Sequence, residues 1–367
     1  MFMIENQCIA VVIPAYNEES QIRMVVDSIP DFVDKIIVVN DGSTDGTRQV
    51  LEDYIRDHPV KSHELHPYTE TDVSGRYEEA ERVIHRKLKE EKEAMVACDV
   101  FNEEENTDRI VLINHRKNSG VGTAVATAYK WCKDRQVDCI VKLDGDGQMD
   151  PSEIEQICNP VVYEGVGYVK GNRLQHPSAW IVIPRVRFLG NAVLSILTKI
   201  ASGYWYVSDT QTAFTAISGK TLQGINLARL YPRYGYPNDI LVRLNINFAI
   251  LKEVEIKPVY RIGERSKMRI RRLVLRLSWH LLKSFFRRIW IKYLFKSFHP
   301  LFILYHAGII LLLISIPYLV KILVYVFEGL KSNPVTVLAF VFLFISGFQS
   351  LLFAMWMDIQ DNTRLYR

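Results

Sequence analysis

The chain has 367 residues, of which 49% are hydrophobic and 23% are charged, and its formal net charge is +4 at pH 7. This composition excludes a disordered chain, a collagen-like chain and a small disulfide scaffold. The apolar residues concentrate in two long runs near the end of the chain, each at least about 20 residues long, the length that spans a bilayer, and a purely soluble enzyme is therefore excluded as well.

Four short runs rich in valine and isoleucine predict strands of an α/β sheet that is covered on both faces. Segments with apolar residues at helical spacing lie between the first two runs, at 19–29, and between the last two, at 122–132. A further strand is expected at 249–259. The four predicted strands are 9–14, 36–40, 110–114 and 140–143.

One connection in this α/β pattern is far longer than the usual handful of residues. Residues 60–108 are highly charged, and within them 77–97 predicts a mostly exposed helix. We interpret the segment as an insertion. Two interpretations of its role stay open, a solvated elaboration without a catalytic part and a surface for a docking partner.

The segment 261–299 carries twelve lysines and arginines and a single acid, Glu264. Aromatic and aliphatic residues alternate with these cations, which is typical of helices that lie in a membrane interface. A basic block also suits nucleic acid, but this one adjoins apolar spans. An anionic membrane surface is therefore the expected partner, and no nucleic acid is expected.

The apolar runs 301–327 and 335–357 are separated by a few polar residues and predict a transmembrane hairpin. The basic flank before the hairpin, and Arg364 and Arg367 after it, place the catalytic domain and both termini in the cytoplasm. The first ten residues lack the basic start of a signal peptide. Five cysteines without a CxxC pair fit a reducing compartment and predict neither a disulfide framework nor a zinc site.

These features divide the chain into four expected parts. They are a catalytic α/β domain, 1–260, the amphipathic interface helices, 261–299, the hairpin, 300–358, and a cytoplasmic tail, 359–367.

The predicted strand 140–143 is followed at once by the sequence DGDGQ, residues 144–148. Two carboxylates two residues apart at the end of a strand suit one divalent cation that keeps positions open for substrate phosphates. Asp144, Asp146 and Gln148 are therefore the candidate ligands of Mg²⁺ or Mn²⁺. A DxD pair alone also occurs in surface turns, so the argument depends on the neighbouring strand ends.

Two more polar turns follow predicted strands, PAYNE at 14–18 and NDGSTDG at 40–46. Ligands of open α/β sheets bind outside the carboxyl ends of the strands, so these turns and the DGDGQ turn are expected to meet in one crevice. Tyr16 is a candidate to flank or stack on a base. Glu18 and Asp41 are candidates to bond base or ribose. Each turn alone also fits a simple Asx turn or helix cap.

The stretch NSGVGTA, residues 118–124, contains G-x-G, but Val125 stands where a dinucleotide site has its third glycine. A dehydrogenase is therefore not expected. We interpret the stretch as a glycine turn before a helix near the nucleotide, with Gly122 at that turn.

Together, IPAYNEES, VNDGSTDGT, NSGVGTA and KLDGDGQMDP resemble glycosyltransferase family 2, and within it the polyprenyl-phosphate hexosyltransferases. The resemblance implies a GT-A fold, a nucleotide-diphospho-sugar donor and a polyprenyl phosphate acceptor, dolichyl or undecaprenyl. It also implies inversion at the anomeric carbon. The two-span layout slightly favours a UDP-sugar over a GDP-sugar. Pro14 belongs to the donor-binding motif, and a metal-bound Asp146 is implied to assist the leaving diphosphate.

The same resemblance implies that Arg173, Arg187 and Arg261 hold the acceptor phosphate, and that Asp239 lies where related enzymes have an acceptor-side acid. The family's usual lysine is replaced by Val121 and a usual arginine by Thr215. The sequence QxxRW of processive synthases is absent.

Two alternatives stay open on the sequence. One is transfer to a lipid hydroxyl, such as that of diacylglycerol, with Asp239 as a base. The other is an inactive nucleotide-binding membrane scaffold. The sequence also leaves a homo-oligomer open.

Overall fold

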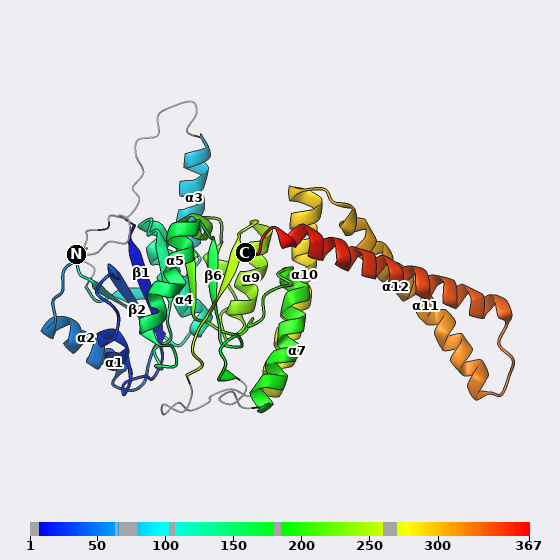
Figure 1. Cartoon of the computed structure of the whole chain (residues 1–367), viewed down its shortest axis with the longest axis horizontal. Coiled ribbons are helices and arrows are strands. Elements are labelled where there is room, and N and C mark those ends of the chain that lie inside the picture. The colour runs from blue at the N-terminus through cyan, green and yellow to red at the C-terminus, as the bar shows by residue number, and fades with distance from the viewer. Residues whose placement is uncertain (1–6, 63–64, 66–78, 103–106, 180–184, 260–269) are drawn as a thin grey trace.

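The computed structural model describes residues 7–62, 65, 79–102, 107–179, 185–259 and 270–367. Its centre is a mixed sheet of eight strands in the order β3-β4-β2-β1-β5-β7-β6-β8 (Figure 1). The strands are β1 (Ile9–Ala15), β2 (Lys35–Asn40), β3 (Cys98–Val100), β4 (Ile110–His115), β5 (Cys139–Lys142), β6 (Tyr168–Asn172), β7 (Thr215–Ser218) and β8 (Leu251–Glu255).

The four strands predicted from valine and isoleucine runs form the parallel half of the sheet, in the order β4-β2-β1-β5. Every residue of these strands is buried, which agrees with the continuous apolar pattern. The other half of the sheet is mixed, because β7 runs antiparallel to both β5 and β6. Strands β5 and β6 are therefore parallel to each other, and their carboxyl ends lie at the same edge.

Helices cover both faces of the sheet, and one apolar cluster lies between the helices and the sheet on each face. On one face pack α4 (Val121–Asp134), α9 (Tyr236–Ile246), α8 (Gly219–Gln223) and the short turn η2 (Leu227–Arg229). The opposite face carries α1 (Ile22–Asp27), α2 (Thr47–Asp57) and α5 (Ile154–Glu164), which follows the turn η1 (Pro151–Glu153). The α/β fold class is thereby confirmed.

The charged insertion contributes the helix α3 (Glu79–Glu93), which stands out from the body at the top of Figure 1. The predicted helix started at 77, and its first two residues lie outside the described part. The described side chains of α3 are mostly exposed, as expected. Glu91 is the exception, because its carboxylate is buried and accepts from Lys133 Nζ of α4 at 2.8 Å and from the Leu227 amide.

The last described helices of the chain connect the catalytic body to a hairpin that extends away from it. Two helices, α7 (Arg185–Ser202) and α10 (Ile270–Trp290), pack against each other and against α9 in a third apolar cluster. A π-helical turn, η3 (Ile291–Lys296), then leads into α11 (Pro300–Phe327), which pairs with α12 (Pro334–Thr363). The predicted interface segment is thus helical from 270, and its residues 261–269 lie outside the described part.

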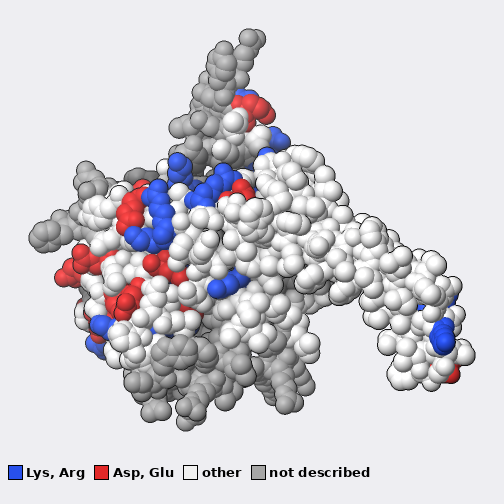
Figure 2. Space-filling model, turned by 45° about the vertical axis from the view of Figure 1, so that its right-hand side comes forward, with Lys and Arg blue, Asp and Glu red and all other residues white. Residues whose placement is uncertain are grey.

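The hairpin α11–α12 extends away from the body, and charged side chains appear on its visible face only at the tip (Figures 1 and 2). Its helices have mean hydropathies of 2.5 and 2.2, and few residues of their apolar stretches are buried. At about 1.5 Å per residue each is longer than the roughly 30 Å core of a bilayer. A Cβ on Gly308 would lie 2.8 Å from the Leu351 side chain, so glycine lets the helices approach closely. Both helices are therefore long and apolar enough to cross a membrane.

A fully buried ion pair fastens the hairpin to the catalytic body. The Arg288 guanidinium of α10 donates to both carboxylate oxygens of Asp358 on α12, at 2.7 and 2.8 Å. It also donates to the backbone carbonyls of Ile200 and Ala201 at the end of α7. Tyr293 donates its hydroxyl to Asp358 at 2.8 Å. Three helices are thereby joined through one guanidinium.

This pair generates a prediction for stability. Asp358→Leu leaves the Arg288 charge buried without a counter-charge, so we expect a loss of about 3–5 kcal/mol of unfolding free energy. Thermal unfolding of the purified protein in detergent should show a lower midpoint. Arg288→Met combined with Asp358→Leu removes both charges and should recover much of the loss. A single variant that unfolds at the wild-type temperature would contradict the assignment.

Candidate active site

The structure brings the polar turns of the sequence motifs together at one edge of the sheet. The Asp41 amide donates to Ala15 O at 2.9 Å, which joins the turns after β2 and β1. The Glu18 amide donates to Thr47 Oγ1 at 2.9 Å, across the same pair of turns. A Cβ on Gly145 would lie 3.4 Å from the Pro14 carbonyl oxygen, so the turn after β5 adjoins the first turn. These turns follow parallel strands, and they meet because such strands end at a common edge.

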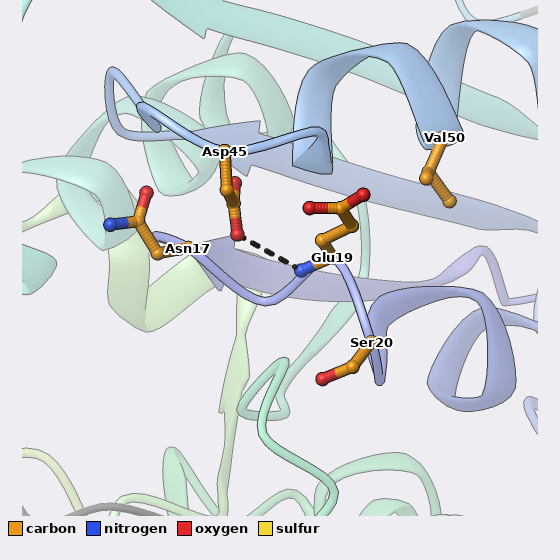
Figure 3. Close-up of a pocket in the computed structure, with 5 residues that line it drawn as sticks. All are labelled: Asn17, Glu19, Ser20, Asp45 and Val50. Atoms are coloured by element: carbon orange, nitrogen blue, oxygen red, sulfur yellow. Dashed lines mark hydrogen bonds between the residues drawn. The ribbon is translucent and has the colours of Figure 1, made fainter.

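An open hollow of about 530 Å³ lies where the first two turns meet. Figure 3 shows five residues that line it. Asp45 accepts a hydrogen bond from the Glu19 amide at 3.4 Å, and Glu19 in turn accepts from the Gly46 amide at 3.0 Å. Asn17 and Ser20 also line the hollow, with Val50 of α2. The acids of the DGDGQ turn do not line it. The hollow is therefore separate from the candidate metal turn, and the hydrogen bonds across it fix the first two turns to each other.

Asp41 is buried and organises the glycine turn at 118–122. Its carboxylate accepts from the amides of Ser119 at 2.9 Å and Gly120 at 2.7 Å. Its Oδ1 also lies 2.8 Å from Nδ1 of His115, and the other ring nitrogen of His115 lies 2.9 Å from the Thr127 hydroxyl. The sequence predicted a contact of Asp41 with base or ribose. In the structure its two oxygens shape the turn.

The glycine turn is covered by the loop PRYGYP, residues 232–237. Gly120 has φ +99°, and a Cβ on it would lie 2.4 Å from the Pro232 carbonyl oxygen. A Cβ on Gly122 would lie 2.0 Å from the Tyr231 carbonyl oxygen. Glycine is needed at both positions because the backbone of this loop rests directly on the turn. Gly122 is buried under the loop.

The DGDGQ turn keeps its three candidate ligands partly exposed. The backbone N–H of Gln148 donates to Asp146 Oδ1 at 3.0 Å. Gly147 has φ +72°, which allows the tight turn of the backbone. Asp144 is paired with the ammonium of Lys142, a buried residue at the end of β5. No group of three or more acids, histidines or cysteines that suits a metal occurs among the described residues. Two carboxylates with an amide oxygen fit Mg²⁺ or Mn²⁺, whose remaining ligands are waters and substrate phosphates.

Tyr16 and Glu18 lie half-buried on the first turn. Burial raises the pKa of the Tyr234 phenol, and the carboxylates of Asp144, Glu18 and Asp146 raise it further. The loop over the glycine turn therefore faces the acids of two other turns.

Of the three candidate arginines, the structure describes the side chain of Arg173 alone. Arg173 follows β6, and its guanidinium donates to both carboxylate oxygens of Asp209, at 2.8 and 3.1 Å. About a quarter of its side chain is exposed. Arg187 lies on α7, but its side chain is outside the described part. Arg261 lies wholly outside the described residues.

Asp239 is fully buried in the first turn of α9. Its carboxylate accepts from Arg243 at 2.7 Å, from Arg287 at 3.1 Å and from His280 at 3.1 Å. The Tyr231 amide donates to it at 3.2 Å. Burial acts to raise the pKa of this carboxyl, but the hydrogen bond from His280 and the two arginines lower it well below its ordinary value. Asp239 therefore links α9 to α10 and the loop.

Sequence reasoning missed two buried lysines, one at the carboxyl end of β5 and one in the middle of β6. Lys142 pairs with Asp144, and Lys170 donates to the Thr212 carbonyl oxygen. Burial lowers the pKa of Lys170 to about 8. A lysine inside an apolar strand was the available signal, in IVKL and in YVKGN. The ion pair of Asp209 with Arg173 was not predicted either.

The model of the family "Glycosyl transferase family 2" matches residues 10–66 and 96–222. The match includes the turns after β1, β2, β4 and β5, and the segment carrying Arg173 and Asp209. It leaves out 67–95, which contains α3.

Curated relatives match over about 70% of the chain. The UDP-N-acetylglucosamine–dolichyl-phosphate N-acetylglucosaminyltransferase of Methanococcus voltae is 28% identical over 256 residues, which are 70% of this chain and 87% of the relative. The undecaprenyl-phosphate mannosyltransferase of Micrococcus luteus is 22% identical over 260 residues, 70% of this chain and 86% of the relative.

Among solved structures, glucosyl-3-phosphoglycerate synthase from Mycobacterium tuberculosis with uridine diphosphate aligns over 77% of this chain and 80% of that one, at 19% identity and a TM-score of 0.45. The expected resemblance to polyprenyl-phosphate sugar transferases is confirmed by the family model and the curated relatives. With its α/β sheet and its clustered motif turns, the chain belongs to glycosyltransferase family 2.

Proposed function

We propose that the protein transfers a hexose from a nucleotide-diphospho-sugar to a polyprenyl phosphate at the cytoplasmic face of a membrane, with inversion and with a divalent cation. One observation supports the proposal above all others. The DGDGQ turn and Arg173 lie at the same edge of the sheet. The catalytic body that contains this sheet is joined to the apolar hairpin by the ion pair Arg288–Asp358. A polyprenyl chain stays in the bilayer, so its phosphate must be met at the headgroups.

The donor would bind across the turns after β1, β2 and β4. Tyr16 and Glu18 would face the nucleoside, and Asp41 would act by holding the glycine turn in shape. Asp144, Asp146 and Gln148 would hold Mg²⁺ or Mn²⁺, which supplies Lewis-acid stabilisation of the leaving nucleoside diphosphate. The name of the Methanococcus voltae relative gives UDP-N-acetylglucosamine as its donor, which supports a UDP-sugar.

The acceptor phosphate is already anionic near pH 7, so its attack on the anomeric carbon needs no strong base. Its charge must instead be held beside an anionic donor. Arg173 suits this task because a guanidinium fork binds phosphate oxygens bidentately. Arg187 and Arg261 are proposed for the same task on the family pattern. Asp239 is buried between two arginines and a histidine, which suits the positioning of α9 and α10 better than proton abstraction.

The proposed orientation places the catalytic body and both ends of the chain on the cytoplasmic side. Helix α10 exposes Leu275, Trp279 and Leu282 next to its basic residues, and α7 exposes Val193 and Ile196. Apolar and aromatic side chains beside lysine and arginine are typical of helices that lie in a membrane interface. The basic flank before α11 also follows the positive-inside pattern.

A transfer assay tests the proposed reaction. Purified protein in detergent would receive dolichyl or undecaprenyl phosphate, Mn²⁺ or Mg²⁺, and labelled UDP- or GDP-sugars. We expect one donor to give organic-soluble label, and EDTA to abolish it. Asp146→Asn should lower the rate about 100-fold or more, because charge stabilisation by a metal is worth several kcal/mol. The exposed Asp53→Asn is the matched control and should keep the wild-type rate.

Label in diacylglycerol, or binding of nucleotide without any lipid-linked product, would contradict the phosphate acceptor. A rate that is insensitive to both EDTA and Asp146→Asn would contradict the role of the metal turn.

The role assigned to Asp41 gives a second prediction. Asp41→Asn places an amide group against the amides of the glycine turn, and a hydrogen bond to a charged acceptor contributes about 1.5–3 kcal/mol. Binding of UDP with Mn²⁺, measured by calorimetry, should weaken about tenfold or more. Asp53→Asn again serves as the control. Unchanged UDP binding would show that the glycine turn does not contribute to the nucleotide site.

Asp239→Asn distinguishes a base from a positioning residue. A general base contributes about 10²–10⁴-fold to the rate, whereas a phosphate acceptor needs none. We expect the variant to unfold at a lower temperature, because Arg243 and Arg287 lose their counter-charge. Its transfer rate per folded molecule should fall by less than about tenfold. A loss of three or more orders of magnitude at an unchanged melting temperature would instead support a hydroxyl acceptor.

A further inference from the structure

We infer that Tyr366 and Glu253 are positioning residues for Arg173, and that through them the segment after the membrane hairpin sets the orientation of the acceptor site. The inference rests on the proposed function, in which Arg173 contacts the acceptor phosphate. It assigns a role in that reaction to residues that follow the membrane helix α12.

As the first step, the chain returns after α12 to the sheet, where residues 365–367 pair with β8. Leu251 of β8 donates its amide to Leu365 O at 2.8 Å and accepts from the Arg367 amide at 2.9 Å. Tyr366 is thereby bridged in parallel to Leu251. The Arg367 guanidinium also donates to Glu164 O at 3.1 Å. Figure 1 shows this end of the chain beside the sheet, at the opposite end of α12 from the hairpin tip.

The second step runs from Tyr366 to Glu253. The Tyr366 hydroxyl donates to Glu253 Oε2 at 3.1 Å. Burial and the nearby Glu253 carboxylate raise the pKa of Tyr366 to about 12, so its phenol is a neutral donor at pH 7. The same carboxylate accepts from the amides of Ser208, at 2.9 and 3.0 Å, and Asp209, at 3.1 Å. Glu253 therefore holds the backbone that carries Asp209.

The third step runs from Asp209 to Arg173. The Asp209 carboxylate is buried and accepts from two guanidinium nitrogens of Arg173. It also accepts from the amides of Gln211 at 3.2 Å and Thr212 at 3.1 Å. Burial acts to raise its pKa, but the Arg173 charge lowers it below the ordinary value, so the carboxylate is ionised at neutral pH. A bidentate fork fixes the guanidinium plane as well as its position.

The loop that carries Asp209 is also held by α12 itself. Trp205 Nε1 donates to Asp358 Oδ2 at 3.3 Å, and the Tyr206 hydroxyl lies 3.4 Å from the Thr363 hydroxyl. The rings of Tyr206 and Tyr366 lie 5.7 Å apart. Residues 205–212 thus lie between the end of the membrane helix and the sheet. Displacement of α12 would be transmitted to Arg173 through these contacts.

Tyr366→Phe tests the inference, because it removes one hydroxyl and preserves the ring. Glu253→Gln is the second variant, and its amide group would face the Ser208 amide. Tyr163→Phe is the matched control, since Tyr163 is an exposed tyrosine of α5. Amide hydrogen exchange of the full chain in detergent would be measured for peptides covering 170–175 and 205–212. Transfer kinetics would be measured with undecaprenyl or dolichyl phosphate.

We expect both variants to exchange about tenfold faster in these two peptides, the scale of one lost hydrogen bond to a charged group. The KM for the polyprenyl phosphate should rise about tenfold, while the KM for the donor sugar stays at its wild-type value. The melting temperature should fall by only about 2–4 °C, the shift that corresponds to one such bond. The control should match wild type in all readouts. A purely structural role would instead impair donor and acceptor binding together.

Unchanged exchange in 170–175 and 205–212 would overturn the inference, whatever the reaction proves to be. Faster exchange with an unchanged acceptor KM would overturn it as well. An inactive wild-type protein would be a failure of the proposed function alone, because the exchange measurement would still show whether Tyr366 holds Arg173.

Discussion

The buried pair of Arg288 and Asp358 is the constraint on which the architecture depends. Neither charge has access to water, so each requires the other at hydrogen-bond distance. Since Arg288 also donates to the end of α7, the pair fixes three helices at once. The hairpin therefore extends from the catalytic body at a defined place. A site that serves a lipid-bound acceptor needs such a fixed distance from the membrane surface.

Charged side chains near the crevice form two groups. Asp144, Asp146 and Glu18 are partly exposed, and a cation and a diphosphate bound there would bring their own charges. Lys142 and Lys170 are buried in two parallel strands, β5 and β6, that flank β7. The antiparallel strand β7 lies between these strands and leaves their carboxyl ends at the same edge. The DGDGQ turn, which suits a metal, and Arg173, which suits a phosphate, consequently lie at the same edge on either side of β7.

The positioning of the site extends well beyond the residues that would touch substrate. Asp41 shapes the glycine turn, Asp239 links α9 to α10, and Asp209 holds Arg173. Each is a buried carboxylate whose acceptor capacity is taken by amides or cationic side chains. Burial makes these bonds strong and makes an unpaired partner costly. This explains how short motifs on loops are held rigidly enough for a sugar-transfer site.

The sequence by itself determined the parallel half of the sheet, the apolar hairpin and the acidic turn at the end of β5, because valine and isoleucine runs, apolar length and paired acids are local signals. It did not determine β6 and β7, whose lysine, glycine and threonine residues become buried only through pairing with distant strands. It named Arg173 and Asp239 but not their partners. Asp209, Glu253 and Tyr366 are far apart in the chain, and only the tertiary structure decided that they form one hydrogen-bonded path, since burial and pairing are properties of the fold.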